Sequence, residues 1–358
     1  MTVWPLFGNA EEPATTTCPH CGAAVPVYAS YCEVCGSSLT PTGPMPAPET
    51  PTGADSSQTR RLGQRASQIT VCPQCGGRID ADGYCALCGS RAPSARDHIE
   101  SSPAPWIAGV SDIGLVHSRN EDALALWADD AAPRAVLVVC DGVSTSAESD
   151  VASLAAAERA REVLVDALRG GMPLDEAFRQ AASQANAAVI EHTQDDSSNT
   201  ASATLAAAVV DGDQLGYANL GDSRVYWIGE NDETLLSTDD SMAQAFIDQG
   251  MARAAAESMP QAHAITKWLG RDSDDIVPDT GTQAMAGPGW VLVCSDGLWN
   301  YASEPAAIAA LVREFAASDA EPAVIARRLV TWTNDRGGHD NVTVALARHE
   351  AGDHGPIV

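Results

Sequence analysis

The stretch Val-Leu-Val-Val-Cys-Asp-Gly at residues 136–142 decides how the rest of the chain is interpreted. A short apolar run rich in β-branched residues is typical of a strand that is covered on both faces. Such a strand places Asp141 at the end of a sheet. A similar run at residues 291–297, Val-Leu-Val-Cys-Ser-Asp-Gly, predicts a second carboxylate, Asp296, at the end of the same sheet. A single Asp-Gly after a strand usually marks only a hairpin turn, so the interpretation depends on further acids.

The composition indicates one large α/β domain with an appendage. The chain has 358 residues and a net charge of −27, and most of its acidic residues follow residue 100. Nucleic-acid binding depends on Lys and Arg that neutralise phosphates, so this charge argues against a nucleic-acid partner. The sequence shows no signal peptide and no apolar run near the roughly 20 residues of a membrane span. We therefore expect a cytoplasmic monomer without a membrane span.

Eight of the ten cysteines lie before residue 90, in two repeats built from Cys-X-X-Cys-Gly. Two residues between cysteines let both sulfurs face one tetrahedral ion, and the glycine permits the turn that follows. In a reducing compartment zinc is favoured over disulfide bonds, which are the alternative. Each repeat resembles a zinc ribbon that holds one structural Zn²⁺. The predicted ligands are Cys18, Cys21, Cys32 and Cys35 in ribbon 1 and Cys72, Cys75, Cys85 and Cys88 in ribbon 2.

Both ribbons are expected to be tethered loosely. The segments that follow them are rich in Pro, Ser, Thr, Gly and Ala, a composition that cannot bury enough surface to become ordered. The ribbons carry few basic residues, so docking to an unidentified protein is favoured over nucleic-acid binding. The predicted organisation is a disordered N-terminus at 1–17, ribbons at 18–36 and 72–89, linkers at 37–71 and 90–105, a globular domain at 106–349 and a tail at 350–358.

From residue 106 onward the pattern becomes globular. Amphipathic helices are predicted at 150–168, 174–192, 241–257, 304–316 and 321–335. Strands are predicted at 107–113, 123–128, 135–141, 202–210, 214–220, 223–228, 290–295 and 342–347. Strands on both sides of a helical pair, with more helices later, predict an α+β fold in which two sheets lie between helical layers, a four-layer α-β-β-α sandwich.

Acidic residues stand at the junctions of these elements. If the junctions converge, repulsion raises the pKa values of the carboxylates unless a cation compensates. Several oxygen ligands of this kind select Mg²⁺ or Mn²⁺. Two such ions about 4 Å apart bind a phosphoryl group and generate a hydroxide nucleophile near neutral pH. The acids concerned are Glu121, Asp122, Asp141, Asp222, Asp296 and Asp340.

The order of these acids resembles that of a known family. The motifs are Asn120-Glu121-Asp122, Asp141-Gly142, Gly221-Asp222-Ser223-Arg224, Ser295-Asp296-Gly297 and Asp340-Asn341. They are similar to those of the metal-dependent protein phosphatases of the phosphatase 2C family, over roughly residues 106–348. The resemblance implies a β-sandwich flanked by helices. It also implies hydrolysis of phosphoserine and phosphothreonine in phosphoprotein substrates, in opposition to a serine/threonine kinase.

Roles for individual residues follow from the resemblance. Asp141 would bridge two Mn²⁺ or Mg²⁺ ions, and Gly142 would be a ligand through its carbonyl oxygen. A metal-bridging water would attack phosphorus in line, without a phosphoenzyme. The other implied ligands are Asp296 and Asp340 directly, Glu121 and Asp122 through water, and Asp222 for a weaker third ion found in bacterial members.

Two departures from the family pattern concern the substrate. His117 stands where the family usually has an arginine that binds the phosphate, and Arg119 lies on the same face of an extended segment. We expect Arg119 to take over that role, with His117 also at the phosphate site. After Asp141-Gly142 the chain continues with Val143-Ser144-Thr145-Ser146, which offers no histidine as general acid. Protonation of the leaving group would fall to a metal-bound water or to His117. The alternative for His117 is an ordinary hydrogen-bonded surface histidine.

These departures keep a second hypothesis open, a phosphatase-like module that binds phosphoproteins with weak or no turnover while the ribbons hold a partner. The presence of all the direct metal-ligating acids argues against it. A third hypothesis, nucleic-acid binding through the ribbons, is disfavoured by charge. Residues from 238 to about 275 match the variable flap of the family, so substrate preference is not predicted from them.

Overall fold

The computed structural model describes residues 15–17, 24–26, 71–81, 83–194 and 199–350. The chain divides into two compact units, Met1–Arg65 and Ala66–Val358. In the first unit, β1 (Thr15–Thr17) pairs with β2 (Ala24–Pro26). The prediction of a disordered N-terminus through residue 17 is therefore wrong for residues 15–17. All four cysteines predicted for ribbon 1, and nearly all of the linker predicted at 37–71, lie outside the described residues.

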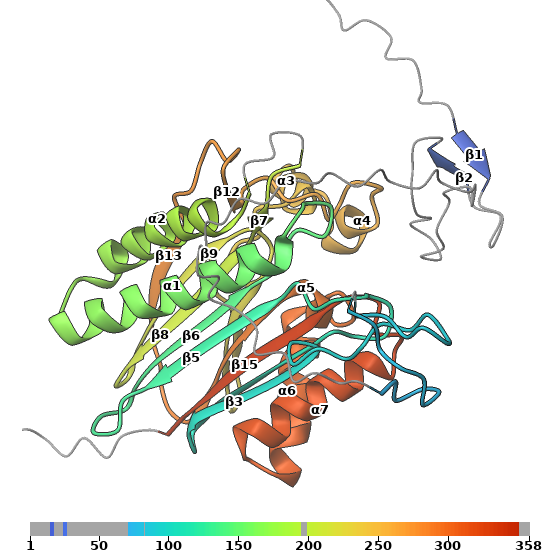
Figure 1. Ribbon diagram of the computed structural model, residues 1–358. Helices are drawn as coiled ribbons and strands as arrows, with labels where there is room; N and C mark the ends of the chain where they lie inside the picture. The colour runs from blue at the N-terminus through green and yellow to red at the C-terminus, as the bar shows by residue number, and fades with distance from the viewer. Residues whose placement is uncertain (1–14, 18–23, 27–70, 82, 195–198, 351–358) are drawn as a thin grey trace, which may run out of the picture. The chain divides into compact units, whose positions relative to one another are not determined.

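Two antiparallel sheets form the centre of the second unit (Figure 1). The six-stranded sheet runs, in spatial order, β11 (Glu233–Leu235), β10 (Arg224–Gly229), β14 (Gly289–Cys294), β15 (Val342–His349), β4 (Ile107–Asp112) and β3 (His98–Ala104). The five-stranded sheet runs β13 (Asp279–Ala284), β9 (Gln214–Leu220), β8 (Leu205–Asp211), β6 (Arg134–Cys140) and β5 (Ala123–Ala128). Two short strands, β7 (Ser202–Ala203) and β12 (Leu269–Gly270), pair separately.

Helices cover the outer face of each sheet (Figure 1). The five-stranded sheet packs against α1 (Ser149–Gly170) and α2 (Leu174–His192), and the six-stranded sheet against α6 (Pro305–Ser318) and α7 (Pro322–Asn334). Three shorter helices are α3 (Met242–Asp248), α4 (Arg253–Glu257) and α5 (Asp296–Trp299). The predicted four-layer α-β-β-α sandwich is confirmed. Within the described residues, no helix combines the length and the apolar character that crossing a membrane requires.

Strand β6 explains the apolar run at residues 136–140. Val136 and Val138 pack in the cluster beneath α1 and α2, whereas Leu137 and Val139 pack between the two sheets. The strand is thus covered on both faces, as predicted, although its neighbours β5 and β8 are antiparallel to it. Asp141 follows β6, whereas Asp296 follows β14 of the other sheet. The prediction that both acids leave the same sheet is wrong.

Two further predictions need correction. The helix predicted at 241–257 is interrupted between α3 and α4, where Gly250 has a φ of 95°, a left-handed conformation that favours glycine. Residues 98–104 fall in the predicted linker at 90–105 but form β3, which pairs with β4. Most of β3 is exposed, and an edge strand of this kind tolerates the Ser and Pro residues that suggested a linker.

Removal of β3 tests the new boundary of the domain. A fragment of residues 106–350 leaves the edge of β4 unpaired. We expect it to be less stable than a fragment of residues 98–350 by about 2–4 kcal/mol, because several strand hydrogen bonds are lost. Thermal unfolding followed by circular dichroism measures the difference. Equal melting temperatures of the two fragments would show that residues 98–104 do not stabilise the domain, as expected of a linker.

Candidate metal centre

Five of the predicted acids interact at one end of the sandwich. Burial raises the pKa of Asp141 well above its ordinary value, and the charges of Asp122, Asp296, Asp340 and Asp222 raise it further. Asp141 and Asp122 flank strands of the five-stranded sheet, whereas Asp296 and Asp340 flank strands of the six-stranded sheet. The packing of the two sheets therefore brings together carboxylates that are far apart in the sequence.

Two carboxylate oxygens in this cluster are buried without a hydrogen-bond partner, Asp122 Oδ1 and Asp296 Oδ1. The other oxygen of each group is bonded: Ser295 Oγ donates to Asp122 Oδ2 at 2.7 Å, and Asn300 Nδ2 donates to Asp296 Oδ2 at 3.0 Å. A buried carboxylate oxygen with no partner costs free energy. Because hard divalent cations prefer oxygen ligands and keep bound waters, Asp296 Oδ1 fits a ligand of the predicted Mg²⁺ or Mn²⁺ and Asp122 Oδ1 fits an acceptor for a bound water.

The remaining pKa shifts have the same origin. Burial raises the pKa of Asp122 to about 7 despite the hydrogen bond from Ser295. Burial and the charges of Asp296 and Asp122 raise the pKa of Asp340 to about 8, although 40% of that side chain is exposed. Burial, followed by the charges of Asp296 and Asp239, raises the pKa of Asp222. Each shift measures how strongly this site resists full ionisation without a compensating cation.

Neutral groups and one arginine hold Glu121. Ser149 Oγ donates to Glu121 Oε1 at 2.6 Å, and Arg119 Nε donates to the same oxygen at 2.7 Å. The backbone amide of Glu121 donates to Asn341 Oδ1 at 2.7 Å. Arg119 also lies 3.8 Å from Asp150, and 47% of its side chain is exposed. Arg119 therefore stands at the surface of the acid cluster with its guanidinium already oriented.

His117 and Gly142 also lie in this region. His117 Nε2 is 3.3 Å from Asp340 Oδ1. The amide of Gly142 donates to the carbonyl oxygen of Glu121 at 3.1 Å. A Cβ at Gly142 would lie 2.5 Å from the carbonyl oxygen of Ser149, so only glycine fits between the two segments. Asp222 is buried in the turn after β9, where Trp299 Nε1 donates to its carbonyl oxygen at 2.9 Å.

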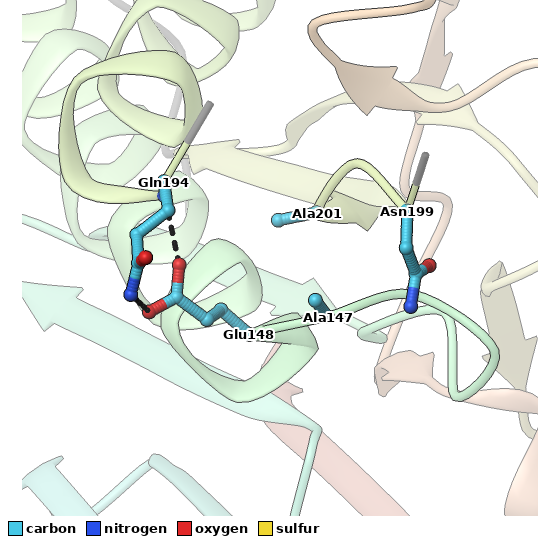
Figure 2. Close-up of a pocket in the computed structure, with 5 residues that line it drawn as sticks. All are labelled: Ala147, Glu148, Gln194, Asn199 and Ala201. Atoms are coloured by element: carbon cyan, nitrogen blue, oxygen red, sulfur yellow. Dashed lines mark hydrogen bonds between the residues drawn. The ribbon is translucent and has the colours of Figure 1, made fainter. Parts of the chain in front are cut away.

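The loop that departs from the family pattern is fixed by its own side chains. Ser146 Oγ donates to the carbonyl oxygen of Val143 at 2.7 Å and accepts from the amide of Ser202 at 3.3 Å. Glu148 adopts a left-handed conformation, and its carboxylate accepts hydrogen bonds from the amide and the side chain of Gln194 (Figure 2). The hollow beside it, about 110 Å³, contains none of the predicted site residues.

Sequence analysis missed the side chains that hold the acids. Ser295 was part of a motif, and Ser149 was not predicted. Thr204, whose Oγ1 accepts from the amide of Asp141 at 2.9 Å, was not predicted to hold an acid. Arg96 fell in a predicted linker, yet it donates to the carbonyl oxygen of Asp122 at 2.8 Å. Serine and threonine have too many structural uses for their position alone to mark them. Nothing in the Pro- and Ser-rich sequence around Arg96 marks it either.

Ribbon 2 has the geometry of a zinc site. The four ligand sulfurs of Cys72, Cys75, Cys85 and Cys88 lie within 4.8 Å of one another. The Cys72–Cys88 and Cys75–Cys85 sulfur pairs are 3.7 and 3.5 Å apart, close to the roughly 3.8 Å edge of a tetrahedron with Zn–S bonds of about 2.3 Å. In the described part of the chain no other group of three or more such ligand atoms is as compact, so the carboxylates around Asp141 are spread more widely.

Comparisons with known proteins agree with both parts of the chain. Residues 18–89 match the double zinc ribbon family model. Protein phosphatase PhpP of Streptococcus pneumoniae is 28% identical over 242 residues, which cover 67% of this chain and 96% of PhpP. Serine/threonine protein phosphatase PstP of Mycobacterium tuberculosis is 33% identical over 245 residues, which cover 67% of this chain and 44% of PstP.

The fold and the family model lead to the same conclusion. A crystal structure of the catalytic domain of PstP in complex with two manganese ions superposes with a TM-score of 0.52 at 26% identity, covering 68% of this chain and 98% of that domain. Residues 116–334 match the family model of protein phosphatase 2C. That match covers more than half of the chain and includes Glu121, Asp141, Asp222 and Asp296. The chain belongs to the protein phosphatase 2C family.

Proposed function

We propose that this chain is a metal-dependent serine/threonine protein phosphatase whose reaction takes place at the acid cluster around Asp141. The observation that carries the proposal is the pair of buried, unpartnered oxygens of Asp122 and Asp296, which come from opposite sheets. The substrates are phosphoproteins, and the opposing activity is that of a serine/threonine kinase.

The proposed divalent site uses Asp141, Asp296 and Asp340 as direct ligands, together with the carbonyl oxygen of Gly142. Glu121 and Asp122 act through water, and Asp222 serves a weaker third ion. Two Mn²⁺ or Mg²⁺ ions agree with the two manganese ions in the PstP structure. When bound, such ions supply positive charge for the phosphoryl group and activate water for attack on phosphorus.

The chain's own groups orient the substrate. Arg119 is half-exposed beside Glu121, so its guanidinium is available to a phosphoryl group that enters the site. His117 lies next to Asp340 and is positioned to donate a proton toward the leaving group. Ser149 and Ser295 keep Glu121 and Asp122 fixed without adding charge. Zinc in the two ribbons is structural in this proposal.

Replacement of Asp141 tests the site directly. We expect Asp141→Asn to lower kcat for a phosphothreonine peptide by more than about 10²-fold, because a neutral amide replaces the carboxylate that would hold the ions. EDTA should abolish the activity of the wild type. Asp166→Asn, the same chemical change on the exposed side of α1, is the control and should be silent. Retention of more than a tenth of wild-type kcat by Asp141→Asn would contradict the proposed site.

Thermal unfolding tests the link between ionisation of the clustered carboxylates and binding of a divalent ion. Because the pKa values of Asp122 and Asp340 are raised in the folded state to about 7 and about 8, their contribution to stability is fully present below the unfolded pKa of about 4 and is lost as pH rises from there to the folded values. In EDTA these two groups should therefore lower the melting temperature between about pH 4 and pH 8, with little further change above pH 8. Mn²⁺ at about 100 times its dissociation constant should raise it by about 5–10 °C.

The rise in melting temperature produced by Mn²⁺ should become larger as pH increases, since the ion binds the ionised carboxylates. Asp141→Asn should flatten both the pH dependence in EDTA and the response to Mn²⁺. A rise in melting temperature with Mn²⁺ that does not depend on pH would indicate that the ion does not bind these carboxylates.

The proposed role of Arg119 in binding the phosphoryl group is tested by steady-state kinetics. Loss of a charged hydrogen bond of about 1.5–3 kcal/mol predicts that Arg119→Met lowers kcat/KM for a phosphopeptide by roughly 10- to 100-fold. Arg119→Lys keeps the charge but lacks the planar fork and should restore only part of the loss. Steady-state kinetics at saturating Mn²⁺ measure the effect, with Arg179→Met on the exposed face of α2 as the matched control. A kcat/KM unchanged by Arg119→Met would show that phosphate is bound elsewhere.

A further inference from the structure

The connector between ribbon 2 and the phosphatase domain, residues 90–97, is hydrogen-bonded to segments of the candidate metal centre. Arg96 Nη1 donates to the carbonyl oxygen of Asp150 at 2.6 Å, and Arg96 Nη2 donates to the carbonyl oxygen of Asp122 at 2.8 Å. In return, Asn120 Nδ2 donates to the carbonyl oxygen of Arg96 at 2.9 Å. One side chain outside the residues matched to the family model thus joins two segments that build the site.

Both of these segments fix carboxylates. Asp122 carries one of the two buried oxygens without a partner. Asp150 lies in the first turn of α1, next to Ser149, whose hydroxyl donates to Glu121. The Arg96 guanidinium also interacts with the charges of Asp122, Asp150 and Glu158, so it places a positive charge behind an acidic site. Loss of Arg96 would release the backbone of both segments.

The other end of the connector is fastened to ribbon 2. Arg91 Nη2 lies 2.7 Å from both carboxylate oxygens of Asp97, the residue after Arg96. Arg91 itself forms a β-bridge with Tyr84 of the ribbon, and the amide of Cys85 donates to the carbonyl oxygen of Ser90 at 2.8 Å. A short hydrogen-bonded turn therefore separates the zinc-ligating cysteines from Arg96.

We propose that Arg96 is a positioning residue for the divalent-ion site and that zinc-loaded ribbon 2 holds Arg96 in place. The inference rests on the proposed function, because it requires ion binding at the acid cluster. Thermodynamic linkage makes the effect reciprocal: zinc in ribbon 2 strengthens divalent-ion binding, and divalent-ion binding strengthens zinc retention. Ribbon 2 then has a role within this chain, in addition to any partner it binds.

The test measures ion affinity in the full-length, zinc-loaded protein by isothermal titration calorimetry with Mn²⁺. Arg96→Met keeps an unbranched stem but removes both donors. We expect it to raise the Mn²⁺ dissociation constant by about 5- to 150-fold. Arg96→Lys keeps the charge without the fork and should fall between Arg96→Met and wild type. Arg179→Met is the matched control and should bind as wild type.

Two variants test the ribbon end while leaving Arg96 in the chain. Arg91→Met removes the ion pair with Asp97, and Cys88→Ser removes one zinc ligand. Mg²⁺, which thiolates bind poorly, is the titrant for both. Both variants should bind Mg²⁺ more weakly than wild type, and Mg²⁺ should slow zinc loss from the wild type to a chelator that does not bind Mg²⁺.

Specific results would overturn the inference. An unchanged Mn²⁺ dissociation constant in folded Arg96→Met excludes the positioning role, and if that variant does not fold, an unchanged Mg²⁺ dissociation constant in Arg91→Met excludes it. Unchanged Mg²⁺ binding by Cys88→Ser excludes the contribution of zinc. A wild-type protein that binds neither ion would instead contradict the proposed function itself.

Discussion

Repulsion among neighbouring carboxylates is the constraint on which the arrangement of this protein depends. Asp141 interacts with four other aspartates, and burial raises the pKa values of several of them. Such a cluster stays together only if something else fixes the backbone beneath it. Here that fixed base is the apolar layer between the two sheets, to which β6 contributes Leu137 and Val139. The site is therefore assembled by packing that has no direct contact with substrate.

The groups around the acids follow a common rule. Ser149, Ser295, Thr204 and Asn341 all hold the acidic segments through hydrogen bonds, and all four side chains are neutral. They fix geometry without cancelling the negative charge that attracts a divalent cation. The positive charges stand at the margins, with Arg119 at the half-exposed surface and Arg96 behind the backbone. The charge of the site is thus preserved where an ion would bind and offset where the chain must be held.

The sequence allowed much of this to be predicted, for physical reasons that differ between elements. The run at 136–140 has apolar residues on both faces, which predicted a strand that is buried on both faces. The order of the acidic motifs indicated the family. Strand pairing is non-local, so nothing near Asp296 revealed that β14 belongs to the other sheet. β3 is an exposed edge strand and therefore lacks an apolar pattern. Arg96 donates hydrogen bonds to backbone carbonyl oxygens of distant residues. Every residue has such an oxygen, so no side-chain pattern in the sequence indicates these contacts.

The origin of Asp141 and Asp296 in different sheets has a mechanical consequence. An ion held by both carboxylates would link the two halves of the sandwich, so a motion that slides one sheet over the other would also disturb its ligands. Ion binding at the proposed site and the packing of the two sheets would then stabilise one another.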